Sequence, residues 1–442
     1  MKKHAPLMLL VSALVAMVPA LAAAQPATSG GLREIQQYSF SIHVLAMLLV
    51  GFGFLMVFVK KYAYSATTGT YLVVAAGIPL YMLLRSTGRL SAEPVEPTGV
   101  QAILLAEFAC ASALIAMGAV LGRLRVYQYA LLAALLVPAY MLNEWMVLDG
   151  GLGVTKTVVD SAGHIVKQGF VDSAGSIVIH AFGAYFGLGL ALALTSRKDR
   201  TKAVEADETS DRFSMLGSMV LWMFWPSFCS AVVKPEEMPR TAIATILALC
   251  GATLATCLVS AMLRKGKISF TDVANAALAG GVAIGATCNA VSPQGAFFIG
   301  LLAGSLSVVG YVLVQPKLDA ALGIVDTCGV HNLHGMPGLL GGLAALVVIP
   351  GIAVAQLAGI AFTVVLAFAS GSLGGWLIRL TGEKRLAYED SEDFSMASAE
   401  LSGAELAFEP SSAAAELPFG TAARRSGKRS KRSAERHGVS NK

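Results

Sequence analysis

Two aspartate–histidine pairs of identical spacing lie within long apolar stretches of this chain. Asp172 precedes His180 by eight residues, and Asp326 precedes His334 by the same eight residues. A carboxylate near a helix start accepts backbone N–H groups and is favoured by the helix dipole. A neutral imidazole offers one hydrogen-bond donor and one acceptor, and ionisable groups inside apolar spans usually face a cavity or a partner. The repeated pattern therefore predicts two capping aspartates and two histidines that meet in a pore.

Three further ionisable residues in apolar stretches receive different interpretations. Glu107 and Glu144 are acidic groups that could draw a cation to the outer mouth of such a pore. His331 lies three residues before His334, but its spacing of five from Asp326 breaks the repeated pattern. We therefore expect His331 to serve helix packing, with a place in the pore as the alternative interpretation.

A short internal repeat surrounds the first of these patterns. Residues 159–166 are echoed twelve residues later by residues 171–178. The first copy contains His164 and runs into polar residues, whereas the second copy stays apolar through His180 and several turns beyond it. We expect only the second copy to enter the membrane, which makes His164 a loop residue.

The elements that must position these residues are membrane spans. Of the 442 residues, 55% are hydrophobic and 14% are charged, whereas soluble proteins carry about a quarter charged residues. Apolar runs of spanning length recur along the chain. They predict eleven spans, at residues 38–59, 69–86, 99–121, 126–147, 172–195, 213–233, 240–263, 272–291, 295–315, 322–349 and 353–380. The expected fold class is an all-α polytopic membrane protein.

The order of the spans suggests an internal duplication. Spans one to five and six to ten make two halves of equal count, and an odd count per half forces the halves to be inverted relative to each other. His180 and His334 each lie in the last span of their half. The sequence therefore predicts a 5+5 inverted repeat plus one C-terminal span, with the two imidazoles meeting between the halves.

The two ends of the chain differ from its apolar middle. Residues 1–24 have a charged start, an apolar centre and a small-residue end, which predicts a cleaved signal peptide, with a retained first span as the alternative. Residues 25–382 form the expected channel domain. Residues 383–442 are rich in Ala, Ser and Glu and then in Arg and Lys, which predicts a disordered tail. The alternative is a tail that binds anionic lipid or a cytosolic regulator.

Basic residues in the short loops predict the orientation. Lysine and arginine gather in alternate loops, at residues 60–61, 123–125, 197–202 and 264–267. Such loops usually face the cytoplasm. Together with a cleaved signal, this places the mature N-terminus outside and the C-terminus in the cytoplasm. We expect a multi-pass protein of the inner (cytoplasmic) membrane.

Other classes of function lack their motifs. The chain has no GxxxxGK[ST] loop, no H-E-x-x-H helix and no nucleophile elbow, so we do not expect an enzyme, a cofactor or a nucleotide-driven pump. The six cysteines fall in apolar stretches without C-x-x-C pairs, so we expect them to be buried structural residues. The net charge of +5 is not a nucleic-acid signal, because much of it lies in cytoplasmic loops and the tail.

Several segments are similar to those of a known family. They are Ala106–Phe108, Ile179–Gly187, Ser210–Asp211, Leu221–Phe228, Asn275–Gly281 and, most specifically, the run Asp326–Gly338. Together they resemble the Rh glycoprotein branch of the ammonium transporter family. The resemblance implies a homotrimer whose protomers each have a narrow hydrophobic pore. It assigns the two histidines and two aspartates above to the pore, and Phe108 and Phe228 to phenyl rings that close its outer mouth. Cys229 departs from the asparagine of the family pattern.

The resulting functional hypothesis is a channel for ammonia. Ammonium would be drawn to the outer mouth and would lose its proton there, because an apolar site disfavours the charged form. Neutral ammonia would then pass along the imidazoles. Two alternatives remain at this point: carbon dioxide or another neutral gas passing through the same pore, and an ammonium sensor or docking platform that acts through the cytoplasmic tail.

Overall fold

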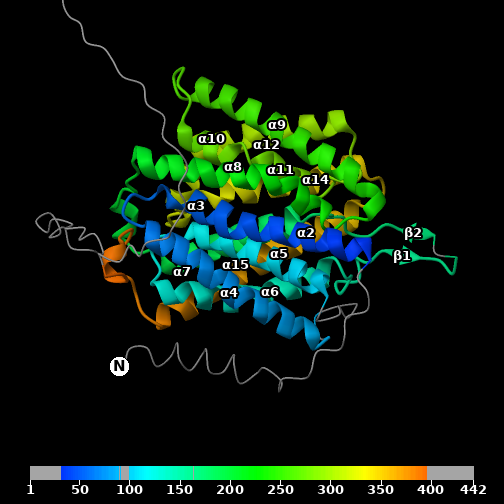
Figure 1. The fold of residues 1–442 in the computed structure, drawn as a ribbon, viewed down its shortest axis with the longest axis horizontal. Helices are drawn as coiled ribbons and strands as arrows, with labels where there is room; N and C mark the ends of the chain where they lie inside the picture. Colours follow the sequence, from blue (N-terminus) through cyan, green and yellow to red (C-terminus); the bar gives the residue numbers. More distant parts are fainter. Residues whose placement is uncertain (1–30, 89, 91–98, 163, 396–442) are drawn as a thin grey trace, which may run out of the picture. The chain divides into compact units, whose positions relative to one another are not determined.

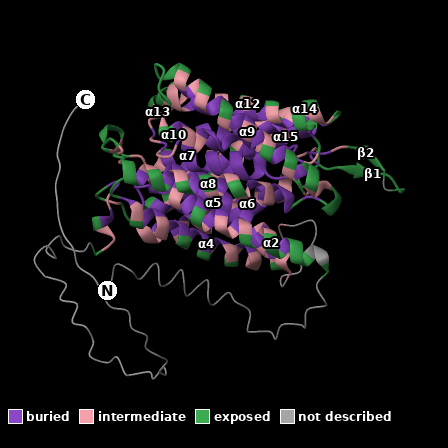
Figure 2. Ribbon diagram, turned by 45° about the horizontal axis from the view of Figure 1, so that its top comes forward, coloured by how far each residue is buried: buried purple, intermediate pink, exposed green. Residues whose placement is uncertain are grey.

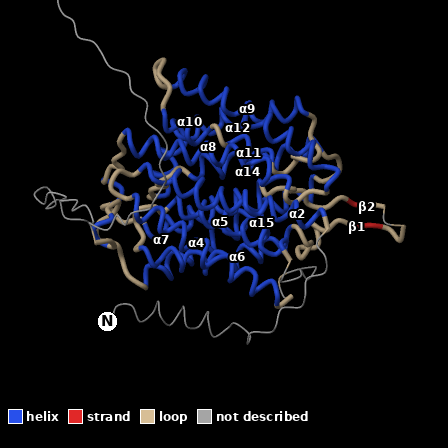
Figure 3. Tube along the Cα trace, in the orientation of Figure 1, coloured by secondary structure: helices blue, strands red, loops and turns tan. Residues whose placement is uncertain are grey.

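The structure, a computed structural model, describes residues 31–88, 90, 99–162 and 164–395. The expected signal peptide at residues 1–24 and the part of the expected tail from residue 396 onward lie outside the described residues. Figure 1 shows the described part as a bundle of long helices that run in similar directions, with a short hairpin projecting at one end. Loops gather mainly at the two ends of the bundle (Figure 3).

The first half of the chain opens on a nearly continuous helix that changes type along its length. It consists of α2 (Leu32–Ala46), the π-helical η1 (Met47–Phe52), α3 (Gly53–Leu55) and η2 (Met56–Phe58). There follow α4 (Ala63–Ser86), α5 (Val100–Ala119), α6 (Val126–Val147), the π-helical η3 (Ser176–Ala181) and α7 (Phe182–Leu194). The hairpin, β1 (Val158–Val159) paired antiparallel with β2 (Ile165–Lys167), lies in the connection before η3.

The second half follows a similar order of long helices. Its elements are η4 (Asp199–Thr201), α8 (Glu208–Ser230), η5 (Pro235–Glu237), α9 (Met238–Leu263), α10 (Phe270–Ala276), α11 (Ala279–Ile284), α12 (Pro293–Val309), η6 (Gly310–Val314), α13 (Gln315–Leu322), the π-helical η7 (His331–Gly335), α14 (Met336–Val348), α15 (Ala353–Leu380) and η8 (Asp390–Glu392).

Eight helices in the described part of the chain are long and apolar enough to cross a membrane. The segment Phe270–Ile284, formed by α10 and α11, is a shorter apolar helix. The expected all-α multi-pass membrane protein is therefore confirmed, apart from one exposed hairpin. That hairpin contains His164, whose side chain is 80% exposed, so its expected loop position is confirmed.

Glycines allow the closest helix contacts in the bundle. A Cβ added to Gly300 of α12 would lie 2.0 Å from the carbonyl oxygen of Ala248 in α9. A Cβ on Gly371 of α15 would lie 2.1 Å from the carbonyl oxygen of Phe186 in α7. Small residues are typical of membrane helix interfaces, where backbones must approach closely to gain dispersion energy. Figure 2 shows the result, a continuous buried centre with exposed residues mainly at the ends and on the outer faces.

The segment 383–395, the start of the expected tail, packs against the bundle. The carboxylate of Asp390 accepts hydrogen bonds from the backbone N–H groups of Tyr64, at 2.9 Å, and Ser65, at 2.9 Å. It thus caps the start of α4. Tyr388 is 4% exposed and donates its backbone N–H to the carbonyl of Gly122 at 2.8 Å. The composition of this segment predicts disorder, because it does not indicate that its few large and acidic residues have partners on the bundle.

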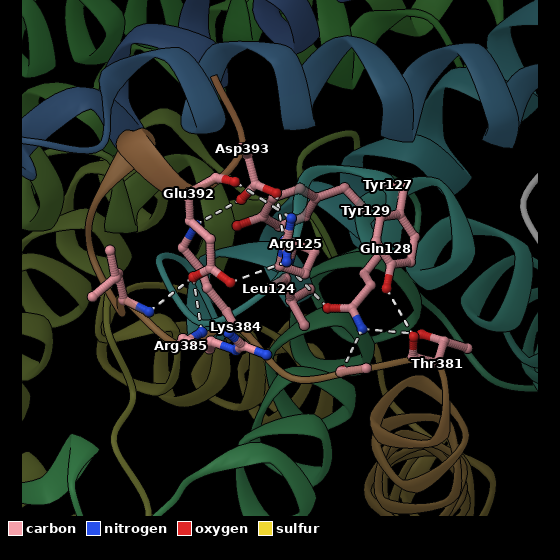
Figure 4. A network of polar contacts seen from close by, with 12 residues as sticks. Leu124, Arg125, Tyr127, Gln128, Tyr129, Thr381, Lys384, Arg385, Glu392 and Asp393 are labelled. Carbon is pink, nitrogen blue, oxygen red and sulfur yellow. Dashed lines mark hydrogen bonds and ion pairs between the residues drawn. The ribbon is translucent and has the colours of Figure 1, made fainter. Parts of the chain in front are cut away.

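Ion pairs hold the same segment at the start of α6. Arg125 contacts Asp393 at 2.6 Å and Glu392 at 3.0 Å (Figure 4). Lys384 contacts the other oxygen of Asp393 at 2.7 Å, and the Lys384 side chain is fully buried. Arg125 lies just outside the apolar helices, and its pKa is raised by the hydrogen bond and the charge of Asp393, although partial burial acts in the opposite direction.

Candidate pore

Each candidate aspartate caps the helix that carries a candidate histidine. One oxygen of Asp172, Oδ2, accepts from the backbone N–H groups of Ile177 at 2.9 Å and Val178 at 2.8 Å. In the second half, Asp326 Oδ1 accepts from Val330 N–H at 3.0 Å, and its Oδ2 accepts from His331 N–H at 3.1 Å. The expected capping is confirmed, and it satisfies donors that would otherwise be orphaned at a buried helix start.

The helices begin later than the sequence pattern suggested. The expected spans started at residues 172 and 322, but the helices start at Ser176 and His331. Both histidines therefore lie in the first, π-helical turn of their helices. The eight residues from each aspartate to its histidine therefore do not form one straight helix, because the chain between each aspartate and its helix is a turn. In each turn a glycine has a positive φ, +81° at Gly175 and +67° at Gly329.

The two histidines meet, as the duplicated pattern predicted. His180 Nδ1 and His334 Nδ1 are 3.3 Å apart, and their rings lie nearly parallel with centroids 5.3 Å apart. Both side chains are buried, at 3% and 4% exposure. One imidazole donates to the other through Nδ1, and either tautomer arrangement is compatible with this contact. The Nε2 atom of His180 has no hydrogen-bond partner among the described residues.

Aromatic rings extend this pair in both directions. Phe108 and Phe228 pack edge to face with centroids 4.6 Å apart, and Phe228 lies 6.1 Å from His180. Both phenylalanines are 3% exposed. On the other side of the pair, the ring of Phe52 lies 6.3 Å from that of His334. The rings thus form a column of the order Phe108–Phe228–His180–His334–Phe52.

Trp225, which is not among the residues predicted from the sequence, contacts the histidine pair. Its ring stacks on His180 with centroids 5.6 Å apart and an angle of 25°, and its Nε1–H has no partner among the described residues. A Cβ on Gly281 would lie 2.4 Å from this indole, so only glycine leaves it room. The sequence offered a reason to select Trp225, because it lies in the segment 221–228 that resembles the family. Phe52 had no comparable signal.

Cavities lie on both sides of the column. The vestibule cavity, about 290 Å³, is bordered by Phe108, Glu144 and Asp172. The histidine cavity, about 30 Å³, is bordered by Phe52 and His334, and holds a molecule the size of water or ammonia. A further cavity of about 140 Å³ lies beside the histidine cavity and shares Phe58, Asn275 and Cys328 with it. The lining of the histidine cavity is almost entirely apolar.

The two candidate glutamates occupy different environments. Glu144 borders the vestibule cavity, where it accepts a hydrogen bond from Tyr81 at 2.8 Å and lies 3.6 Å from Arg85. Glu107 is fully buried and accepts from Ser41 at 2.6 Å, and it does not border that cavity. Of the two candidates, only Glu144 therefore borders the vestibule cavity. Glu107 and Phe108 are adjacent in α5, but adjacent helix residues point in different directions, so only Phe108 borders the cavity.

His331 lies beside the pair without joining it. Its ring packs edge to face on Tyr185 with centroids 5.7 Å apart, and a Cβ on Gly335 would lie 2.9 Å from its Nδ1. No contact between His331 and His180 occurs in the described structure, which favours the packing interpretation. Among the described residues no group of three or more His, Cys, Asp or Glu is placed to hold a metal ion.

A bundle of membrane-crossing helices around a narrow, largely apolar route between cavities is the architecture of a membrane channel or transporter. Residues 7–401 match the model of the Ammonium Transporter Family. The chain therefore belongs to this family, and its similarity to curated Rh proteins places it in the Rh branch. The family consists of transporters and channels, not enzymes.

The relatives cover much of the chain. Ammonium transporter Rh type B-B of Xenopus laevis is 39% identical over 313 residues, which are 70% of this chain and 64% of that protein. Ammonium transporter Rh type A of Canis lupus familiaris is 36% identical over 322 residues, 72% of this chain and 73% of that protein. The chain thus spans about 64% of the length of the first relative.

Solved structures show the same fold. Nitrosomonas europaea Rh50, described as one of the Rhesus protein family of channels, superposes with a TM-score of 0.79 at 61% identity, covering 83% of this chain and 94% of that chain. Mep2 of Saccharomyces cerevisiae superposes with a TM-score of 0.63 at 18% identity, covering 77% of this chain and 84% of that chain. The second similarity supports the fold alone.

Proposed function

We propose that this protein conducts ammonia through the column of rings that contains His180 and His334. The observation that carries the proposal is the buried imidazole pair between the vestibule and histidine cavities. The names of the relatives, ammonium transporters, and the description of Nitrosomonas europaea Rh50 as a channel support the same substrate. We infer that ammonium and ammonia are the ligands of this route.

The geometry suggests how the charged form is excluded. Ammonium gathers in the vestibule cavity, where Glu144 and Asp172 supply carboxylates. The Phe108–Phe228 contact then offers only apolar ring surface, and transfer of a cation into such a site is strongly unfavourable. The proton is therefore left on the vestibule side, since burial disfavours the protonated amine.

Beyond the phenyl rings, neutral ammonia meets polar atoms without a fixed charge. The unpartnered Nε2 of His180 and Nε1–H of Trp225 offer hydrogen bonds that replace part of the hydration of ammonia. A neutral pair binds the molecule weakly enough for it to leave again, whereas a buried carboxylate would trap it. The apolar histidine cavity then receives it.

The finer architecture is part of the same proposal. We propose eleven spans, with the five helices up to α7 and the next five up to α14 forming an inverted repeat, and α15 as the last span. Loops rich in lysine and arginine then face the cytoplasm, and the vestibule cavity, bordered by Gln101, Leu148 and Lys234, faces outward. We further propose an inner-membrane location and a homotrimer, each protomer with its own pore.

Stopped-flow measurement of internal pH in proteoliposomes tests the proposal. An ammonium gradient should cause rapid alkalinisation when ammonia enters. His180→Ala and His334→Ala should slow it by about 2–10-fold each, since each loses a hydrogen bond of about 0.5–1.5 kcal/mol along the route. His331→Ala is the matched control, because its ring lies outside the pair.

The outcomes separate the alternatives. Alkalinisation in both pore variants that is as fast as in wild type and His331→Ala, and faster than in protein-free liposomes, would overturn the proposal. Carbon dioxide entry is measured as acidification in the same liposomes. If His180→Ala and His334→Ala slow the entry of carbon dioxide and leave the entry of ammonia unchanged, the result would favour a carbon dioxide channel over an ammonia channel.

A further inference from the structure

A second large cavity lies at the end of the bundle opposite the vestibule. This basic cavity, about 730 Å³, lies between the start of α6, the end of α7 and the end of α15 with the segment that follows. Seven of its lining residues are lysine or arginine and two are aspartate or glutamate, an excess of five positive charges. The proposed route for ammonia does not use it.

Several of these cations have no acidic partner. Lys384 is paired with Asp393, and Arg379 is paired with Glu383. In contrast, the side chains of Arg197, Lys198 and Arg385 make no ion pair or hydrogen bond within the described part of the chain. Cations of one sign around a concave surface create a positive potential that concentrates anions.

Arg123 is a buried member of the same cavity. It is 6% exposed, and its terminal nitrogens donate to the carbonyls of Ala119 and Val325 and to the hydroxyl of Thr195. Its Nε–H has no partner among the described residues, and none of its hydrogen bonds there goes to a carboxylate. Burial lowers the pKa of Arg123, although the charges of Asp199 and Asp326 act in the opposite direction. A buried guanidinium that has no carboxylate in hydrogen-bond contact is unfavourable.

We propose that the basic cavity binds a phosphate group. A phosphate carries up to two negative charges and several acceptor oxygens, so it can accept hydrogen bonds from guanidinium and ammonium groups on different walls at once. It would supply the hydrogen-bonding anion that Arg123, Arg197 and Lys198 lack among the described residues. The group could belong to free phosphate or to the headgroup of an anionic phospholipid, because the cavity lies at the proposed cytoplasmic end of the spans.

The test compares two double variants of the full chain with equal loss of charge. Arg197→Gln with Lys198→Gln removes two exposed cations of the cavity. Lys267→Gln with Lys317→Gln removes two exposed lysines that do not border it. Inorganic phosphate is titrated by calorimetry into the purified protein, and native mass spectrometry counts phosphatidylglycerol against phosphatidylcholine retained from mixed nanodiscs.

We expect the cavity variant to bind phosphate at least about tenfold more weakly than the wild type, and the control variant to bind within about twofold. Loss of retained phosphatidylglycerol in the cavity variant, without measurable binding of inorganic phosphate to the wild type, would assign the group to a lipid. Wild-type protein that binds neither probe overturns the proposal. Equal weakening in both variants also overturns it, because it would show attraction by net charge alone.

Discussion

The two capping aspartates should respond differently to replacement by asparagine. Asp172 uses a single oxygen, Oδ2, for both of its backbone donors, and its Oδ1 has no partner in the described structure. An asparagine can place its carbonyl oxygen at Oδ2 and its NH2 group at the unpartnered position. Asp326 uses Oδ1 for Val330 and Oδ2 for His331. An asparagine there must turn its NH2 group toward one of these N–H donors.

The magnitude follows from the hydrogen bonds that each substitution removes. Asp326→Asn leaves one buried N–H group facing another donor, which costs about 1–3 kcal/mol. Asp172→Asn keeps both hydrogen bonds and loses only the strengthening that a charged acceptor gives, so we expect less than about 1 kcal/mol. Replacing either residue by alanine removes both hydrogen bonds and the cap. We expect Asp172→Ala to cost about 2–4 kcal/mol and to disturb the turn that carries His180.

Two assays measure the prediction. Chemical denaturation of the purified protein, followed by tryptophan fluorescence, gives the differences in the free energy of unfolding. Alkalinisation of proteoliposomes gives the flux. We expect Asp172→Asn to retain flux within about twofold of wild type and Asp172→Ala to lose most of it. The reasoning is refuted if Asp172→Asn abolishes flux while stability is unchanged, because the negative charge and not the cap would then be required.

Three further predictions concern the surroundings of the pore. Gly281→Ala should push the indole of Trp225 off the imidazole pair and lower ammonia flux with little loss of folded protein, measured in proteoliposomes and by thermal unfolding. Asp393→Ala should leave Lys384 without its ion-pair partner and Arg125 with Glu392 alone, which costs about 3–5 kcal/mol when such a pair is buried, and should make the segment 383–395 sensitive to limited proteolysis. The hydrogen bond from the backbone N–H of Ser210 holds the pKa of Asp207 below its usual value. The cap that Asp207 forms on α8 is therefore fully present above the ordinary carboxylate pKa and is lost as the pH falls through the lowered pKa. Hydrogen exchange at the Ser210 amide should accelerate only in that acidic range.

The pairing of the histidines could be predicted because it depends on topology and spacing alone. The inverted duplication that we propose would bring equivalent spans together, and both histidines follow their aspartates at the same distance in the sequence. The spans were also predictable, since the membrane requires long apolar helices. Contacts that depend on which face a residue occupies were not. The burial of Glu107 against Ser41 depends on how α5 turns relative to α2, and hydropathy does not encode that rotation.

The docked segment 383–395 escaped prediction for a different reason. Composition measures whether a stretch can bury a core of its own, and this stretch cannot. It is ordered instead by surfaces that the bundle already offers: the open start of α4, the guanidinium of Arg125 and the space above Gly122. Each partner is more than 250 residues away in sequence, so a local pattern carries no information about it.

The late start of the two pore helices could have been predicted from a glycine that follows each aspartate in the sequence. The spacing between aspartate and histidine alone does not indicate it. Both copies read Asp-x-x-Gly-x-x-x-x-His, with Gly175 and Gly329 at the same offset, and both glycines adopt a positive φ. A helix cannot run through such a residue, so each aspartate must stand before the turn and cap the helix that follows it. The histidine then falls in the first turn, and in both copies that turn is π-helical, a form common at functional sites. The repeated unit is therefore a whole cap, turn and π-helical start, and its recurrence in both halves argues that the geometry of this unit, not the imidazole alone, sets the position of the pair.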